Sequence, residues 1–236
     1  MKELSKQMKK ISLMMVFVLI ATVIWAQDDE RNKEHLQVDL GLPSGTLWAF
    51  TNVGAAVPED NGDYFAWGEV DYKSDYSWNT YKYVKGGDAT KLTKYCAQAN
   101  IGNAKYTDEL AELEVSDDVA TQKWGEGWCM PTQAQFEELK KECTWKWMTR
   151  NGNNVIEITG KNGNKLYLPA AGCHFNKSRS LVGSNGFYWS RTLSDKGSSR
   201  GQCFTFSQND TEVAVRTRNL GLTVRPVRSP NYVPEE

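Results

Sequence analysis

The stretch Asn154-Val-Ile-Glu-Ile-Thr-Gly-Lys-Asn-Gly-Asn-Lys-Leu-Tyr-Leu168 encodes the clearest β-hairpin of this 236-residue chain. Two runs rich in β-branched and aromatic residues flank an Asn-Gly pair, which is a strong signal for a tight hairpin turn. We therefore predict strands at 154–159 and 165–168. A core carried by antiparallel strands is the first expectation for the fold.

Four more strands are predicted downstream of this hairpin. Their apolar residues recur at alternate positions, which is typical of strands with one buried face. Pro226 has no backbone N–H, so the last of these strands should lie at a sheet edge or end there. The predicted strands are 186–190, 202–206, 212–216 and 222–227.

Two amphipathic helices precede the hairpin. The first is predicted to begin at an N-cap, Ser116, and to end at Gly125. The second begins with a capping box formed by Thr132 and Gln135. Its apolar residues have helical spacing, so the face with Phe136, Leu139 and Cys143 is expected to be buried.

The N-terminal part of the domain also indicates strands. Leu36 to Leu40 and Thr46 to Val53 flank a Pro-Ser-Gly turn and predict a hairpin, and 64–67 is a short aromatic strand. Residues 69–103 show no clear period and are expected to form a long ordered loop. Strands, then two helices, then strands predict an α+β fold of antiparallel sheets, in which the first and last strands meet.

The first 26 residues are typical of an export signal. Four lysines precede an apolar run of about 16 residues, shorter than the roughly 20 that a spanning helix needs. We expect a signal peptide at 1–26, a polar spacer at 27–35, one domain at 36–228 and a tail at 229–236. An uncleaved anchor is the alternative; after cleavage no membrane span is expected, and the protein would be secreted or lie in the cell envelope.

Charge and cysteine content limit the partners. Removal of residues 1–26 takes away four Lys and one Glu and moves the formal net charge from −1 to −4, with no basic run left. Nucleic acid is therefore not an expected partner. The five cysteines contain no CxxC pair and cannot all pair within one chain, so each is expected to be a small buried side chain rather than a zinc ligand.

Six sequence blocks, in order, resemble the Fibrobacter succinogenes major paralogous domain, a module of exported proteins in Bacteroidetes-type bacteria. The resemblance covers nearly all of the expected mature chain and implies a C-type-lectin-like fold. The blocks are Val38-Asp-Leu-Gly-Leu-Pro-Ser-Gly-Thr46, Gly62-Asp-Tyr-Phe-Ala-Trp-Gly-Glu69, Trp124-Gly-Glu-Gly-Trp-Cys-Met-Pro-Thr132, Leu168-Pro-Ala-Ala-Gly172, Gly183-Ser-Asn-Gly-Phe-Tyr-Trp-Ser190 and Val224-Arg-Pro-Val227.

This family is distantly similar to the formylglycine-generating enzyme. Cys129-Met-Pro-Thr-Gln-Ala-Gln-Phe136 is similar to a conspicuous block of that enzyme, but Cys129 stands where a basic residue is usual. Near the C-terminus only Cys203 is present, so the pair of active-site cysteines has no counterpart. The resemblance therefore implies the fold but not the thiol chemistry, and we expect no enzyme activity.

The resemblance also suggests where a ligand would bind. In C-type-lectin-like proteins diversified by retroelements, the C-terminal strands and loops carry the variable ligand-contacting positions, and the run from Phe187 to Val227 resembles that region. Ordinary solvated strand faces are the alternative. The residues predicted to contribute to a binding face are Arg191, Asp195, Arg200, Gln202, Asn209, Glu212, Arg216, Arg218 and Asn219.

Two other candidate sites are weaker. Trp145 and Trp147 share a face if the chain is extended there and would form an aromatic platform. Oxygen-bearing residues at 60–63 could hold calcium, but an Asn-Gly turn with solvated acids explains them, so no cofactor is predicted. Gln208-Asn-Asp210 only loosely resembles an element of calcium-dependent sugar-binding lectins. Core packing is expected for Trp48, Trp67, Trp124 and Trp128.

The function expected from these observations is an exported, non-catalytic binding or adhesion module of the bacterial cell envelope. Its partner would be a glycan or a surface protein, recognised through the C-terminal strands and loops. The alternative is an envelope enzyme that acts on glycans or protein thiols, since two catalytic carboxylates leave no sequence motif. A structural subunit of a surface assembly is a third possibility.

Overall fold

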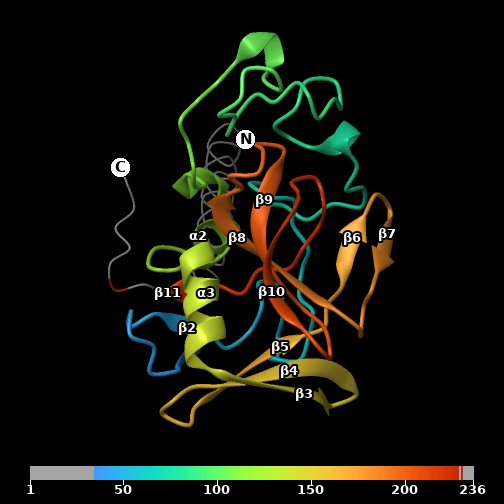
Figure 1. Ribbon diagram of the computed structural model, residues 1–236. Coiled ribbons are helices and arrows are strands. Elements are labelled where there is room, and N and C mark those ends of the chain that lie inside the picture. The colour runs from blue at the N-terminus through green and yellow to red at the C-terminus, as the bar shows by residue number, and fades with distance from the viewer. Residues whose placement is uncertain (1–34, 229, 231–236) are drawn as a thin grey trace, which may run out of the picture. The chain divides into compact units, whose positions relative to one another are not determined.

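The computed structural model describes residues 35–228 and residue 230 (Figure 1). The predicted signal peptide, nearly all of the spacer and all but one residue of the tail lie outside the described residues. Residues 35–228 belong to one compact unit. Its fold is α+β and mostly antiparallel, which confirms the predicted class. Within the described residues, none of the helices is long and apolar enough to cross a membrane.

Three small antiparallel sheets and one two-stranded ribbon make up the domain. The sheets have the strand orders β1-β2-β11, β3-β4-β5 and β10-β9-β8, and β6 pairs with β7. The elements in chain order are β1 (Gln37–Asp39), β2 (Leu47–Ala49), the 3-10 helices η1 (Trp78–Thr80), η2 (Asn103–Lys105) and η3 (Val115–Asp117), α2 (Val119–Trp124), α3 (Gln133–Glu142), β3 (Thr144–Arg150), β4 (Asn153–Thr159), β5 (Lys165–Pro169), β6 (Cys173–Phe175), β7 (Ser178–Ser180), β8 (Gly186–Leu193), β9 (Arg200–Phe206), β10 (Thr211–Thr217) and β11 (Val227–Arg228).

The predicted hairpin at 154–168 is confirmed as β4 and β5. The first and last strands also meet as predicted, because β11 pairs with β2, which pairs with β1. Three predicted strands are wrong in extent. Of the strand predicted at 46–53 only 47–49 forms β2, the 64–67 segment forms only a bridge between Phe65 and Leu222, and of the strand predicted at 222–227 only Val227 lies in β11. Residues 223–226 are held instead by single backbone hydrogen bonds. Trp189 N–H donates to Thr223 O, Val53 N–H to Val224 O and Ala49 N–H to Pro226 O.

Helices α2 and α3 each begin at a residue whose side chain caps the helix. In α3 the capping box of Thr132 and Gln135 is present as predicted, and Phe136 and Leu139 are buried. The first helix begins later than predicted, because Asp118 and not Ser116 is the N-cap of α2. Its carboxylate accepts from the N–H groups of the first helical turn and also from Met130 N–H, which ties the helix to the chain that enters α3.

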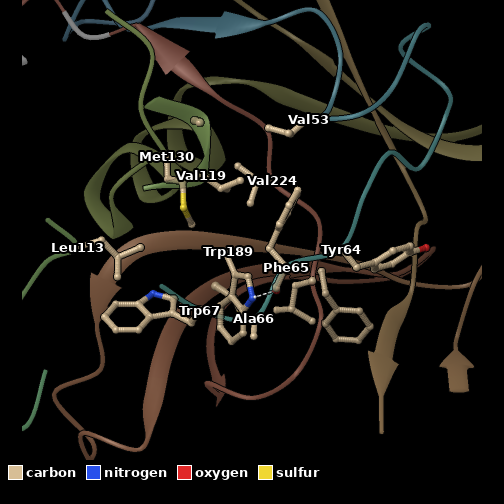
Figure 2. Close-up of a cluster of buried hydrophobic side chains, with 14 of the residues drawn as sticks. Val53, Tyr64, Phe65, Ala66, Trp67, Leu113, Val119, Met130, Trp189 and Val224 are labelled. Atoms are coloured by element: carbon tan, nitrogen blue, oxygen red, sulfur yellow. Dashed lines mark hydrogen bonds between the residues drawn. The ribbon is translucent and has the colours of Figure 1, made fainter. Parts of the chain in front are cut away.

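Two clusters of buried side chains form the core. The first core cluster surrounds Phe65, Trp67 and Trp189, and Figure 2 shows these rings together with aliphatic side chains from distant segments. Trp189 Nε1 donates to Phe65 O at 2.8 Å, so the indole N–H is paired. The second core cluster surrounds Trp48, Phe136, Phe204 and Phe206. The four tryptophans predicted to lie in the core, Trp48, Trp67, Trp124 and Trp128, are all buried.

Arg225 ties the C-terminal segment to two of the sheets. Its side chain is fully buried, and Nε donates to Asn52 Oδ1 at 2.7 Å. The other guanidinium nitrogens donate to the carbonyls of Ala49, Phe50 and Tyr167 at 3.0, 2.6 and 2.9 Å. Burial lowers the pKa of Arg225 to about 10, so the group stays charged at neutral pH. The end of β2 and the middle of β5 are thereby fixed against one side chain.

Arg225→Lys is expected to lower the free energy of unfolding by about 3–5 kcal/mol, because an ammonium cannot reach the same carbonyls and leaves buried acceptors unpaired. Urea unfolding measures the change. Arg200→Lys, at an exposed position at the start of β9, is the matched control and should change stability by less than about 0.5 kcal/mol. Equal stability of the two variants would contradict the role assigned to Arg225.

Candidate ligand-binding surface

The β8-β9-β10 sheet carries most of the predicted binding residues. One face presents Cys203 and Ala214, paired across the strands, to the first core cluster. The other face presents Phe204 and Val213 to the second core cluster, where Phe136 of α3 stacks on Phe204 at 5.2 Å. Figure 1 shows α3 alongside this sheet, and it contacts all three strands. With both faces covered, the accessible parts of the sheet are its edge and its turns.

A shallow groove of about 270 Å³ lies between β3 and the turn that joins β9 to β10, and we call it the tryptophan groove. One wall is aromatic. Trp145 and Trp147 lie two residues apart in β3 and share a face, as predicted, and both are half-buried. Their rings pack against Phe204 and Phe206 at 5.3 and 6.4 Å. The lining residues are Trp145, Trp147, Ile156, Ser207, Gln208, Asn209, Asp210 and Thr211.

The opposite wall of the tryptophan groove is a tight polar turn. Ser207 N–H donates to Asp210 O at 2.9 Å and Thr211 N–H donates to Asp210 Oδ1 at 2.8 Å, so the backbone is fixed. Gln208 and Asn209 lie at the exposed tip. Within residues 35–228 their side-chain amides have no hydrogen-bond partner. The groove thus places amides that can both donate and accept opposite two indole rings.

A second groove, of about 370 Å³, is lined mainly by β10, and we call it the β10 groove. Gln202 Nε2 donates to Asp195 Oδ1 at 3.4 Å on its floor. Arg216 Nη1 donates to its neighbour's carbonyl, Val215 O, at 2.9 Å, and the guanidinium lies 5.4 Å from the Phe187 ring. The lining residues are Gln133, Asp195, Lys196, Gln202, Glu212, Val213, Ala214, Val215 and Arg216.

The structure divides the nine predicted binding residues into three sets. Asp195, Gln202, Glu212 and Arg216 meet in the β10 groove, and Asn209 lies in the tryptophan groove. Arg191 pairs with Glu112 at 2.5 Å, and Arg200 is exposed at the start of β9, but neither lines these grooves. The third set, Arg218 and Asn219, lies inside the protein.

Arg218 and Asn219 hold the long loop instead of facing solvent. Arg218 is fully buried, and its guanidinium donates to the carbonyls of Lys94 and Tyr95. It also lies 5.3 Å from the Trp67 ring. Asn219 is 3% exposed and donates to Tyr76 O at 2.7 Å. Neither residue has a surface to offer a ligand, so we remove both from the predicted binding face.

Sequence reasoning missed the parts of these grooves that come from elsewhere in the chain. Gln133 begins α3 and Ile156 lies in β4, and neither has a local signal of function. Lys196 lies in a loop that was predicted as a binding region but was not singled out. The sequence signals for the tryptophan groove were the spacing of the two tryptophans, the weak resemblance of 208–210 to a lectin element and the prediction of Asn209 as a binding residue.

Three of the cysteines, Cys129, Cys143 and Cys203, lie in surroundings that suppress thiolate formation. All five are free, and four of them are buried. Burial raises the pKa of the thiols of Cys129 and Cys203 to about 12 and that of Cys143 to about 11. Because the thiolate is the reactive species, these three side chains are suited to packing rather than to redox chemistry.

Asp117 is the centre of a charged cluster that could be mistaken for an active site. The buried carboxylate accepts hydrogen bonds from the hydroxyls of Tyr83 and Tyr95. Lys94 and Lys82 pair with it at 2.6 and 3.2 Å. Burial would raise the pKa of Asp117, but these donors outweigh burial and lower it. Every group in the cluster points at the carboxylate, so the cluster fixes the long loop to η3.

Comparison with family models, with curated proteins and with solved structures found no match to this chain. The likeness to the major paralogous domain family therefore rests on the six sequence blocks. Within the described residues, no group of three or more His, Cys, Asp or Glu is placed to hold a metal ion.

Asp117→Asn is expected to lower the free energy of unfolding at neutral pH by about 1.5–3 kcal/mol, because it removes the charged acceptor of the Tyr83 and Tyr95 hydroxyls and leaves half-buried Lys94 with Glu114 alone. Since the folded-state pKa is lowered, the stabilisation is complete above the unfolded value of about 4 and is lost as the pH falls through the folded value. Urea unfolding between about pH 7 and pH 3 should show a flatter pH dependence for the variant. Parallel curves would contradict this role.

Proposed function

We propose that this chain is an exported, non-catalytic binding module of the bacterial cell envelope that recognises a glycan through the tryptophan groove. One observation carries the proposal. The half-exposed indole rings of Trp145 and Trp147 line the same groove as the exposed side-chain amides of Gln208 and Asn209. The predicted signal peptide supports export, and the six blocks that resemble the major paralogous domain support a C-type-lectin-like fold.

The chemistry of the groove suits a sugar ring. A pyranose has an apolar face of C–H groups, which packs on an indole, and a rim of hydroxyls, which both donate and accept. Gln208 and Asn209 offer the matching amide groups. A groove of about 270 Å³ is at the lower limit of small-molecule sites, which span roughly 300–1,000 Å³, so it would hold one sugar unit of a longer chain.

Binding fits the tryptophan groove better than cleavage does. Glycoside hydrolysis generally needs two carboxyl groups on either side of the scissile bond. Asp210 is the one carboxylate among the residues that line this groove. The alternative of an envelope enzyme that acts on glycans would have to use the β10 groove, where Asp195 and Glu212 both lie. The alternative of thiol chemistry is disfavoured at Cys129 and Cys203, whose burial raises the thiol pKa to about 12.

A glycan array probed with the purified protein tests the proposal. Trp147→Ala should weaken binding of the captured glycan at least about tenfold, because it removes half of the aromatic wall. Asn209→Ala should weaken it about two- to tenfold, the effect of one lost neutral hydrogen bond. The matched control is Tyr72→Ala, which removes an aromatic ring that is 71% exposed and lies outside both grooves; it should leave binding unchanged.

Unfolding midpoints of all three variants separate loss of the site from loss of the fold. Binding that survives Trp147→Ala and Asn209→Ala in folded protein would overturn the tryptophan groove as the site. Capture of proteins but of no glycan would overturn the ligand class. Release of shortened sugars that stops with Asp195→Asn would replace binding by catalysis in the β10 groove.

A further inference from the structure

The sequence of β10 is complementary to itself. It reads Thr211-Glu-Val-Ala-Val-Arg-Thr217. If two copies of the strand lie antiparallel about Ala214, each Glu212 faces Arg216 of the other copy and each Val213 faces Val215. The threonines at the two ends also face each other. Opposite charges in directly paired positions stabilise an antiparallel pair, and like charges destabilise it.

The outer edge of β10 has no strand beside it. In the described part of the chain β10 pairs with β9 alone and ends its sheet. The strand is seven residues long and carries neither proline nor lysine, the residues that commonly protect exposed edges. Its two valines are half-buried, and Val213 packs against the second core cluster, so the accessible part of the strand is its backbone edge. Such an edge is a template for another strand.

The backbone alternation places the free groups of β10 at this edge. Ser207 N–H donates to Asp210 O across the hairpin turn, so Ser207 and Asp210 are a hydrogen-bonded pair. In an antiparallel ladder such pairs recur at every second residue, so Ala214 and Cys203 are also a hydrogen-bonded pair. The N–H and C=O groups of Val213 and Val215 therefore point outward. Among residues 35–228, the single bond to these groups comes from Arg216, which donates to Val215 O.

The segment that would pair also borders a groove. The β10 groove is lined by every residue from Glu212 to Arg216, together with residues of β9, the β8-β9 loop and α3. The bond from Arg216 to Val215 O is between neighbours in the chain. A partner's N–H can take over that carbonyl, which frees the guanidinium for the partner's Glu212.

We propose that two copies of this chain form a symmetric dimer through antiparallel pairing of their β10 edges, with the two-fold axis at Ala214. Each of the two Val213–Val215 pairs contributes two backbone hydrogen bonds, and two Glu212–Arg216 ion pairs flank them. A second copy fits better than a foreign strand because the charge pattern is complementary to itself. The dimer does not depend on what the tryptophan groove binds.

An interface of one strand pair is small, so a dissociation constant of roughly micromolar order is expected. Sedimentation velocity over a range of concentrations tests the dimer. Glu212→Arg alone and Arg216→Glu alone should each weaken dimerisation at least about tenfold, since symmetry places two like-charged pairs in every dimer. The double variant E212R/R216E should restore it, and an equimolar mixture of the two single variants should form a heterodimer.

The control is Glu126→Lys, a charge reversal at an exposed position away from β10, which should leave the dimer intact. Melting temperatures of all variants show that each is folded. A wild-type protein that stays monomeric at every concentration would overturn the proposal. A dimer that is insensitive to both single reversals, or one that the double variant fails to restore, would also overturn it.

Discussion

The fold depends on a buried guanidinium whose partners are backbone carbonyls and one amide. Arg225 reaches the end of β2, the chain that follows it and β5 at the same time. A charge in this position is costly to bury, and the hydrogen bonds offset that cost only if every acceptor stays in place. The C-terminal segment, the N-terminal hairpin and the β3-β4-β5 sheet therefore hold one another in a single arrangement.

Arg218 performs a related task for the long loop. Its guanidinium joins the carbonyls of Lys94 and Tyr95, and the Asp117 cluster fixes the same loop from the other side. Polar side chains that look functional in the sequence are thus used to hold the long loop, which has no regular backbone hydrogen bonds of its own. The parts left for recognition are the turn at 207–211 and the outer edge of β10, both attached to a rigid frame.

Local signals explain what could be predicted from the sequence. The Asn-Gly hairpin, the capping box of Thr132 and Gln135 and the alternation in β8 to β10 depend on neighbours in the chain, and all were correct. The burial of Arg218 and Asn219 depends on carbonyls more than a hundred residues away, so both were taken for surface residues. The tryptophan pair was predicted, but its polar wall required the turn at 207–210 to lie beside β3, which only tertiary packing decides.

The proposed glycan site lies between the indole rings of β3 and the 207–211 turn. Nitrogen-15 NMR of the labelled protein, titrated with the oligosaccharide that binds most tightly on an array, tests it most directly. If the glycan binds there, the indole N–H signals of Trp145 and Trp147 and the amide signals of Gln208 and Asn209 should shift together and saturably. Shifts confined to other parts of the domain, with these signals unmoved, would contradict it.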